Sequence, residues 1–186
     1  IDLDRFDLQM LKKMSMHDLP SLADAMRHFI VEHVSRTGGH VGANTGVVEL
    51  TIALHYIFDA PQDKILFDCG HIGYTHRILT RRGHLFPTLN TFGGMSRFLD
   101  SKESPFDILS VSHAGTALSP AAGLAHAMRM ASDSHCVVAV VGDGTMGEGS
   151  CWEGLDYIAD TDLPVIIVLN DNGYSIPKTV GGIRHI

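Results

Sequence analysis

Two continuous runs of β-branched and other apolar residues on either side of one helical segment constrain this chain most strongly. The runs are residues 136–141 and 165–169, and the segment between them that favours a helix is 148–159. A strand that is apolar at every position is typical of burial on both faces of a parallel sheet. Strands separated by a helix run parallel, with a right-handed crossover. The sequence therefore predicts a βαβ unit in an α/β protein.

The rest of the chain continues this alternation. Helices are expected at 21–37, 46–58, 74–82 and 118–130, with a short helix within 1–19 and a further strand at 64–68. Short helical turns and loops are expected at 83–112, and a loop at 172–186. Ser21 is the expected N-cap of the first long helix. Alternating helices and buried strands predict a three-layer α/β sandwich with a mainly parallel sheet, here in one domain spanning 1–186.

Charge and composition exclude several classes of protein. The 186 residues carry a formal net charge of −7, whereas a general nucleic-acid binder needs a basic face. No apolar run approaches the roughly 20 residues that span a bilayer, and no signal peptide opens the chain. The three cysteines lack metal-type spacing and are expected to be free thiols in a reducing compartment. We expect a cytoplasmic protein that acts on small molecules, without nucleic-acid or membrane partners.

Oxygen-bearing side chains follow both ends of the βαβ unit. Asp143 comes just after the first strand and Asn172 just after the second, so the parallel topology brings them to one edge of the sheet. Magnesium prefers oxygen ligands and is often shared with substrate phosphates. Gly142 and Gly144 let the backbone approach a ligand closely, and the helix that begins near Glu148 favours an anion at its N-terminus. These features predict a metal ion that binds a diphosphate.

Two other interpretations of this segment remain open. Residues 142–147 also fit G-x-G-x-x-G, the dinucleotide fingerprint, and Asp171 ends the next strand where a ribose-binding acid could lie. In that case Asp143 would face the pyrophosphate without a counter-charge. The other alternative is purely structural, a glycine turn followed by a capping asparagine.

The pair Gly142-Asp143-Gly144 and Asn170-Asp171-Asn172 resembles the thiamine-diphosphate motif of transketolases and their relatives. The resemblance implies the thiamine-diphosphate-binding fold, with Mg²⁺ held by Asp143, Asn172 and the backbone carbonyl of Tyr174. It also implies that Gly144 and Thr145 lie against the diphosphate.

Further segments are similar to 1-deoxy-D-xylulose-5-phosphate synthases. They are residues 35–43 with Thr-Gly-Gly-His, 48–55, 68–80 with Asp-x-Gly-His, 92–96, and Glu103-Ser104. Together they cover nearly the whole chain. The resemblance implies carboligation, in which a donor such as pyruvate loses carbon dioxide and its two-carbon unit joins an aldehyde.

The resemblance also assigns roles to residues outside the βαβ unit. His40 and His71 would be the catalytic residues, because both would face the substrate and the reactive ring of the cofactor. An imidazole beside a carbonyl can transfer a proton or donate a hydrogen bond. Ser112, His113 and Ala114, together with His71, would contact the cofactor.

Some positions depart from the synthase pattern. Ser112, Ala114 and Gly115 replace glycine, serine and serine, and Ile72 replaces a glutamine. Residues 145–150 and Trp152-Glu153 are more similar to a transketolase or a 2-oxo acid dehydrogenase. A subunit of a split transketolase that moves a ketol unit therefore remains an alternative.

Enzymes of this kind need a glutamate that activates the aminopyrimidine ring, and in the family it lies on a second domain. The chain is too short to hold both domains, so we expect the pyrimidine-binding domain to lie on another polypeptide or on a further part of a longer protein. A hetero-oligomer or a homodimer is implied, and the isolated chain is expected to be inactive.

Overall fold

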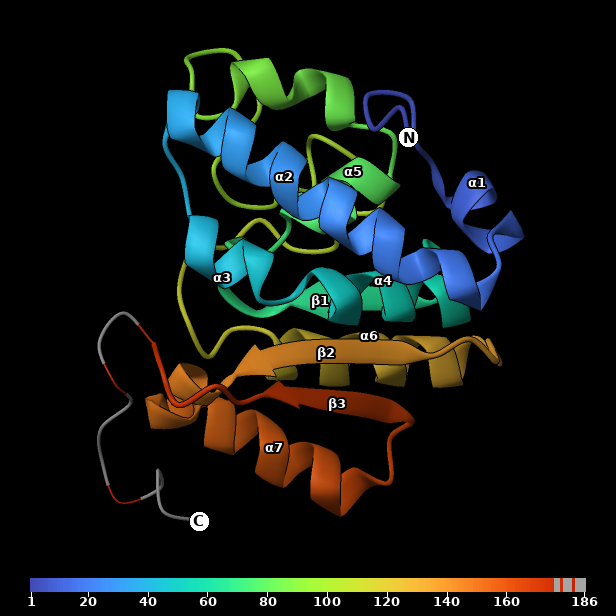
Figure 1. Cartoon of the computed structure of the whole chain (residues 1–186). Helices are drawn as coiled ribbons and strands as arrows, with labels where there is room; N and C mark the ends of the chain where they lie inside the picture. Colours follow the sequence, from blue (N-terminus) through green and yellow to red (C-terminus); the bar gives the residue numbers. More distant parts are fainter. Residues whose placement is uncertain (176–177, 179–181, 183–186) are drawn as a thin grey trace.

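The structure, a computed structural model, describes residues 1–175, 178 and 182 (Figure 1). Its α-helices are α1 (Leu8–Lys13), α2 (Leu19–Thr37), α3 (Val41–Thr45), α4 (Val48–Ile57), α5 (Tyr74–Leu79), α6 (Leu118–Met130) and α7 (Gly149–Thr161). Its 3-10 helices are η1 (Met16–Asp18), η2 (Asp68–Gly70), η3 (Gly83–Thr88) and η4 (Asp143–Gly147). Its strands are β1 (Lys64–Phe67), β2 (Val137–Gly142) and β3 (Val165–Asn170).

The three strands form one parallel sheet in the order β1-β2-β3. β2 lies in the middle, with Lys64 paired to Val137 on one side and Val137 paired to Val165 on the other. The predicted parallel βαβ unit is thus confirmed, with α7 as its crossover helix. All three strands end at the same edge of the sheet, where the loops that follow them meet.

Helices cover both faces of this sheet, which makes the three predicted layers (Figure 1). Alternate residues of β2 point to opposite sides. Ala139 and Val141 pack with α6 and α7, whereas Val138 and Val140 pack with residues of α4. β2 is buried along nearly its whole length, as an apolar strand between two helical layers must be.

β3 differs from the expectation of a strand buried on both faces. Its side chains are only partly buried, and Ile166 and Leu169 are 41% and 51% exposed. An edge position alone does not explain this, because β1 also pairs only with β2 among the described residues and is buried. The reason is incomplete cover: Val165 and Ile167 pack on the cluster of α6 and α7 and Val168 on that of α4, whereas Ile166 and Leu169 belong to neither cluster. A run of apolar residues therefore identified the strand correctly but not how completely its faces are covered.

The start of α2 and the presence of α3 also differ from the prediction. α2 begins at Leu19, after Asp18 and with a proline in its first turn, so Ser21 lies inside the helix and the predicted cap is wrong. Proline fits the first turn because its fixed φ suits a helix and its missing N–H would be unpaired there anyway. α3 is a separate short helix that the sequence did not predict. Within residues 1–175, 178 and 182, the structure holds no helix with the length and apolar character that a membrane span requires.

Candidate active site at the carboxyl edge of the sheet

The predicted metal ligands follow adjacent strands. Gly142, the last residue of β2, pairs with Asn170, the last residue of β3. Asp143 directly follows the first of these and Asn172 lies just beyond the second, so both predicted ligands stand at one edge of the sheet. The loops also touch, because a Cβ atom on Gly144 would lie 2.8 Å from the Ser175 hydroxyl oxygen.

Asp68, at the carboxyl end of β1, joins these loops and was not predicted from the sequence. Its carboxylate is 2% exposed. It accepts hydrogen bonds from the backbone N–H groups of Gly115, Thr116 and Ala117 at 2.8–3.0 Å. It also accepts one from the Thr145 hydroxyl at 2.5 Å. One buried acid therefore positions the loop before α6 and the glycine loop after β2. The signal that could have identified it is its place at a strand end, as the first residue of the Asp-x-Gly-His segment.

The segment predicted to contact the cofactor lies beside the start of α7. Ser112 and His113 are exposed, Ala114 is half-buried, and the His113 Nδ1 lies 2.6 Å from the Ala114 carbonyl oxygen. A Cβ atom on Gly115 would lie 2.6 Å from the Ser150 hydroxyl oxygen. This close approach explains glycine at a position where the synthase pattern has serine.

The two histidines predicted to be catalytic lie side by side although they are far apart in sequence. The rings of His40 and His71 have centroids 5.4 Å apart in an edge-to-face arrangement. Each Nδ1 atom is buried without a hydrogen-bond partner among the described residues. Burial, followed by the charge of Arg97, lowers the pKa of His40. Burial and then the charge of His40 lower the pKa of His71, against the opposing charge of Asp68.

The donor set at the sheet edge consists of oxygen atoms, which are the ligands that a hard cation takes. The Asn172 side-chain oxygen accepts a hydrogen bond from the Tyr174 N–H at 2.8 Å, and a carbonyl-type oxygen keeps a second lone pair. No cluster of three His, Cys, Asp or Glu side chains able to hold a metal occurs in residues 1–175, 178 and 182. The predicted set, one carboxylate, one amide and one backbone carbonyl, needs no such cluster.

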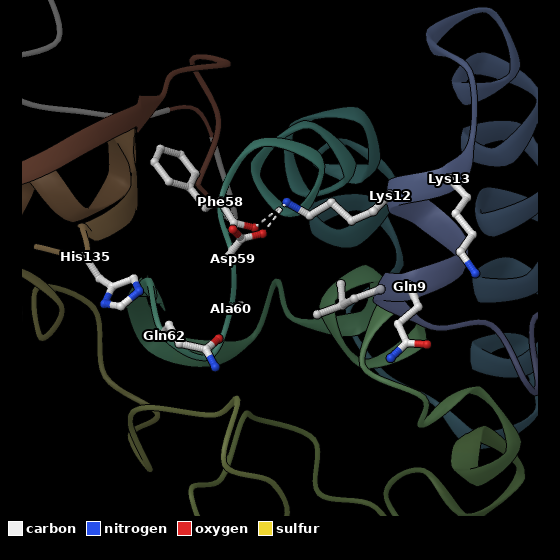
Figure 2. A pocket seen from close by; sticks show the side chains of 9 residues that line it. Gln9, Lys12, Lys13, Phe58, Asp59, Ala60, Gln62 and His135 are labelled. Carbon is white, nitrogen blue, oxygen red and sulfur yellow. Dashed lines mark hydrogen bonds and ion pairs between the residues drawn. The ribbon is translucent and has the colours of Figure 1, made fainter.

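A separate groove of about 600 Å³ lies at the opposite edge of the sheet (Figure 2). Phe58, Asp59 and Gln62 precede β1, and His135 precedes β2, so their loops lie at the amino ends of the strands. Lys12 of α1 crosses the groove to Asp59, with a nitrogen–oxygen distance of 2.7 Å. None of the residues predicted for the active site lines this groove.

A family model and similar relatives of known name point to the same protein family. The family model described as 1-deoxy-D-xylulose-5-phosphate synthase matches residues 4–186. Proteins named 1-deoxy-D-xylulose-5-phosphate synthase from Frankia casuarinae and Rhodococcus erythropolis are 49% and 51% identical over 94% and 93% of this chain. The chain spans 27% of the length of each of these relatives.

A solved structure supports the fold. The transketolase from Leishmania mexicana superposes with a TM-score of 0.74 over 85% of this chain and 28% of its own. At 19% identity, this likeness concerns the fold alone. With the family model matched from residue 4 to residue 186, the chain belongs to the 1-deoxy-D-xylulose-5-phosphate synthase family.

Proposed function

We propose that this chain is the diphosphate-binding part of a thiamine-diphosphate-dependent transferase. The reaction is decarboxylation of pyruvate or a similar donor, followed by transfer of the two-carbon unit to an aldehyde, as the name of its relatives suggests. The observation that carries the proposal is the convergence of the Asp143 loop and the Asn172 loop at one sheet edge in a chain of this family. The proposed compartment is the cytoplasm.

In this proposal Asp143, Asn172 and the Tyr174 carbonyl hold Mg²⁺. The ion offsets the repulsion between the Asp143 carboxylate and a diphosphate, and Gly144 and Thr145 lie against the diphosphate. Thr145 suits this place because its hydroxyl is already held by Asp68, which fixes the loop before a ligand arrives. Thiamine diphosphate, when bound, supplies the carbanion chemistry, and the chain supplies orientation and charge.

His40 and His71 are the proposed proton-transfer groups. Their lowered pKa values favour the neutral imidazole at pH 7. A neutral ring can accept a proton at one nitrogen and donate a hydrogen bond from the other. Because the Nδ1 atoms are buried, the proposal assigns the contact with substrate to the other ring nitrogen, Nε2, of each histidine.

The proposed activity also needs a domain that carries the pyrimidine-binding glutamate, on another chain or on a further part of the same protein. With such a partner, the assembly would be a hetero-oligomer or a homodimer. The alternative of a split transketolase is favoured by residues 145–150 and Trp152-Glu153. Release of carbon dioxide from pyruvate by the reconstituted enzyme supports carboligation, whereas turnover of a sugar phosphate alone supports the ketol transfer.

Calorimetry tests the binding step directly. The purified chain is titrated with thiamine diphosphate in the presence of Mg²⁺, with thiamine diphosphate in the presence of a chelator, and with NAD. Saturable binding that requires both thiamine diphosphate and Mg²⁺ is expected. Binding of NAD alone would favour the dinucleotide interpretation and overturn the proposal.

A further inference from the structure

Asn44 connects the two histidines through its side-chain amide. It lies in α3 and is fully buried. Its Nδ2 atom donates one hydrogen bond to the His40 carbonyl at 2.7 Å and another to the His71 carbonyl at 2.8 Å. Both amide hydrogens are therefore used, one on each histidine.

The other end of the same side chain is also occupied. Asn44 Oδ1 accepts a hydrogen bond from the Tyr74 N–H at 2.9 Å. The Tyr74 hydroxyl in turn accepts one from the His40 N–H at 3.4 Å. Asn44 and Tyr74 thus join the turn before α3 to the turn before α5 by four hydrogen bonds.

The His40 ring also contacts the ring of Phe98, with centroids 5.5 Å apart, but among the described residues no side-chain hydrogen bond links the two imidazoles. His40 makes no side-chain hydrogen bond as the N-cap of α3, and the Nδ1 atoms of both histidines are without partners among the described residues. The relative placement of the rings, 5.4 Å between centroids, is therefore set by their backbones. Asn44 holds both backbones from one atom.

We infer that Asn44 is a positioning residue, which fixes the distance between His40 and His71 for the transfer reaction. This inference rests on the proposed function for its catalytic consequence but not for its geometry. Asn44 would not touch substrate; it acts through the two histidines. A change of about 1 Å in the place of a catalytic group can lower a rate by about a hundredfold.

Asn44→Asp is the sharpest test because it keeps the size and the Oδ1 acceptor for Tyr74. It removes both donors and places a carboxylate oxygen beside two carbonyl oxygens. Thr51→Val is the matched control, since Thr51 is also fully buried and its hydroxyl only returns to the Val47 carbonyl, at 2.8 Å. Circular dichroism confirms that both variants are folded.

Nuclear magnetic resonance on the labelled chain gives a readout that needs no activity. Cross-ring proton contacts between His40 and His71 are expected in the wild type and in Thr51→Val, and their loss is expected in Asn44→Asp. If Asn44→Asp does not fold, the inference is tested on the wild-type chain. Its Asn44 side-chain amide protons must then exchange slowly with solvent and show proton contacts to both Val41 and Ile72. Absence of either contact, or unchanged ring contacts in a folded Asn44→Asp, overturns the inference.

Kinetics of the enzyme reconstituted with its partner domain supply the second arm. Asn44→Asp is expected to lower kcat about tenfold to a hundredfold, while thiamine-diphosphate affinity changes less than about threefold, because the Asp143 loop is untouched. If the wild type binds no thiamine diphosphate, the proposed function fails. The positioning role of Asn44 is then tested only by the cross-ring proton contacts between His40 and His71. If the wild type is active and Asn44→Asp keeps its kcat, only the inference fails.

Discussion

The carboxylate of Asp68 accepts a 2.5 Å hydrogen bond from the hydroxyl of Thr145 and thereby joins the end of β1 to the glycine loop after β2. The same carboxylate binds three consecutive backbone N–H groups before α6. Asp68 is the point at which three segments of the proposed cofactor site are held together, and all of these contacts are buried or partly buried.

Removal of the Thr145 hydroxyl should therefore destabilise the protein. Thr145→Val keeps the shape but loses a hydrogen bond to a charged group, and we expect the free energy of unfolding in urea to fall by about 2 kcal/mol. Thr145→Ser is the control, because it keeps the hydroxyl and loses only one methyl group. We expect it to lower the free energy of unfolding by about 1 kcal/mol. A Thr145→Val protein as stable as wild type would show that the bond contributes nothing.

Asp143→Ala should abolish Mg²⁺-dependent binding of thiamine diphosphate. The reason is the loss of the only carboxylate in the proposed ligand set, which leaves the metal an amide and a carbonyl. Asp171→Ala is the matched control, because Asp171 lies in the neighbouring loop and accepts a hydrogen bond from the Gly173 N–H. Calorimetry measures both affinities, and unchanged affinity in Asp143→Ala would refute the assigned metal role.

Gly39→Ala should disturb the turn that carries His40. Gly39 has a φ of 145°, and a Cβ atom there would lie 2.5 Å from the Tyr74 hydroxyl oxygen. We expect a loss of about 1–3 kcal/mol in the free energy of unfolding, from strain and the displaced tyrosine. Gly42→Ala, in α3 with nothing within 4 Å, should be neutral or stabilising by up to about 1 kcal/mol. Equal effects of the two changes in thermal unfolding would contradict this explanation.

Stability should fall as the pH drops from 7.5 to 5.5, because burial lowers the pKa values of two histidines that are hydrogen-bonded to each other. The His55 Nε2 and His76 Nδ1 atoms are 2.8 Å apart, and His76 Nε2 lies 3.0 Å from the Asp107 carboxylate. Burial, and then the charge of His76, hold the pKa of His55 well below its ordinary value of 6.5. Burial also lowers the pKa of His76, although its hydrogen bond to Asp107 opposes this.

The sign follows from these lowered values. As the pH falls through 6.5, the unfolded chain takes up protons that the folded protein still excludes, so the folded state loses about 1.4 kcal/mol per pH unit for each such histidine. Urea unfolding at the two pH values should show a loss of about 1–3 kcal/mol. His55→Gln removes one titrating ring, and a pH dependence identical to wild type in that variant would contradict the prediction.

The isolated chain should show no turnover of pyruvate. It is proposed to lack the glutamate that activates the cofactor ring, so binding and catalysis are expected to separate. An assay of the purified chain with thiamine diphosphate, Mg²⁺ and pyruvate checks this, with the reconstituted enzyme as the positive control. Robust release of carbon dioxide without a partner domain would contradict it.

Strong local patterns predicted much of the fold. The continuous apolar runs at 136–141 and 165–169 identified two neighbouring parallel strands, and the residues that follow them were correctly expected at one sheet edge. The partial exposure of β3 was missed, because apolar character shows that a strand is favoured but not how completely helices cover its two faces. α3 was missed because five residues rich in small side chains carry too little periodicity to be recognised.

The sequence by itself determined the parallel sheet, the family and the residue types offered at its carboxyl edge, because these depend on local patterns and on motifs of adjacent residues. Only the tertiary structure decided which residues hold the site together. Asp68 binds Thr145 and Asn44 binds His40 and His71 across long stretches of chain. Such contacts depend on how separate loops meet after the sheet has formed, and no spacing within either loop specifies them.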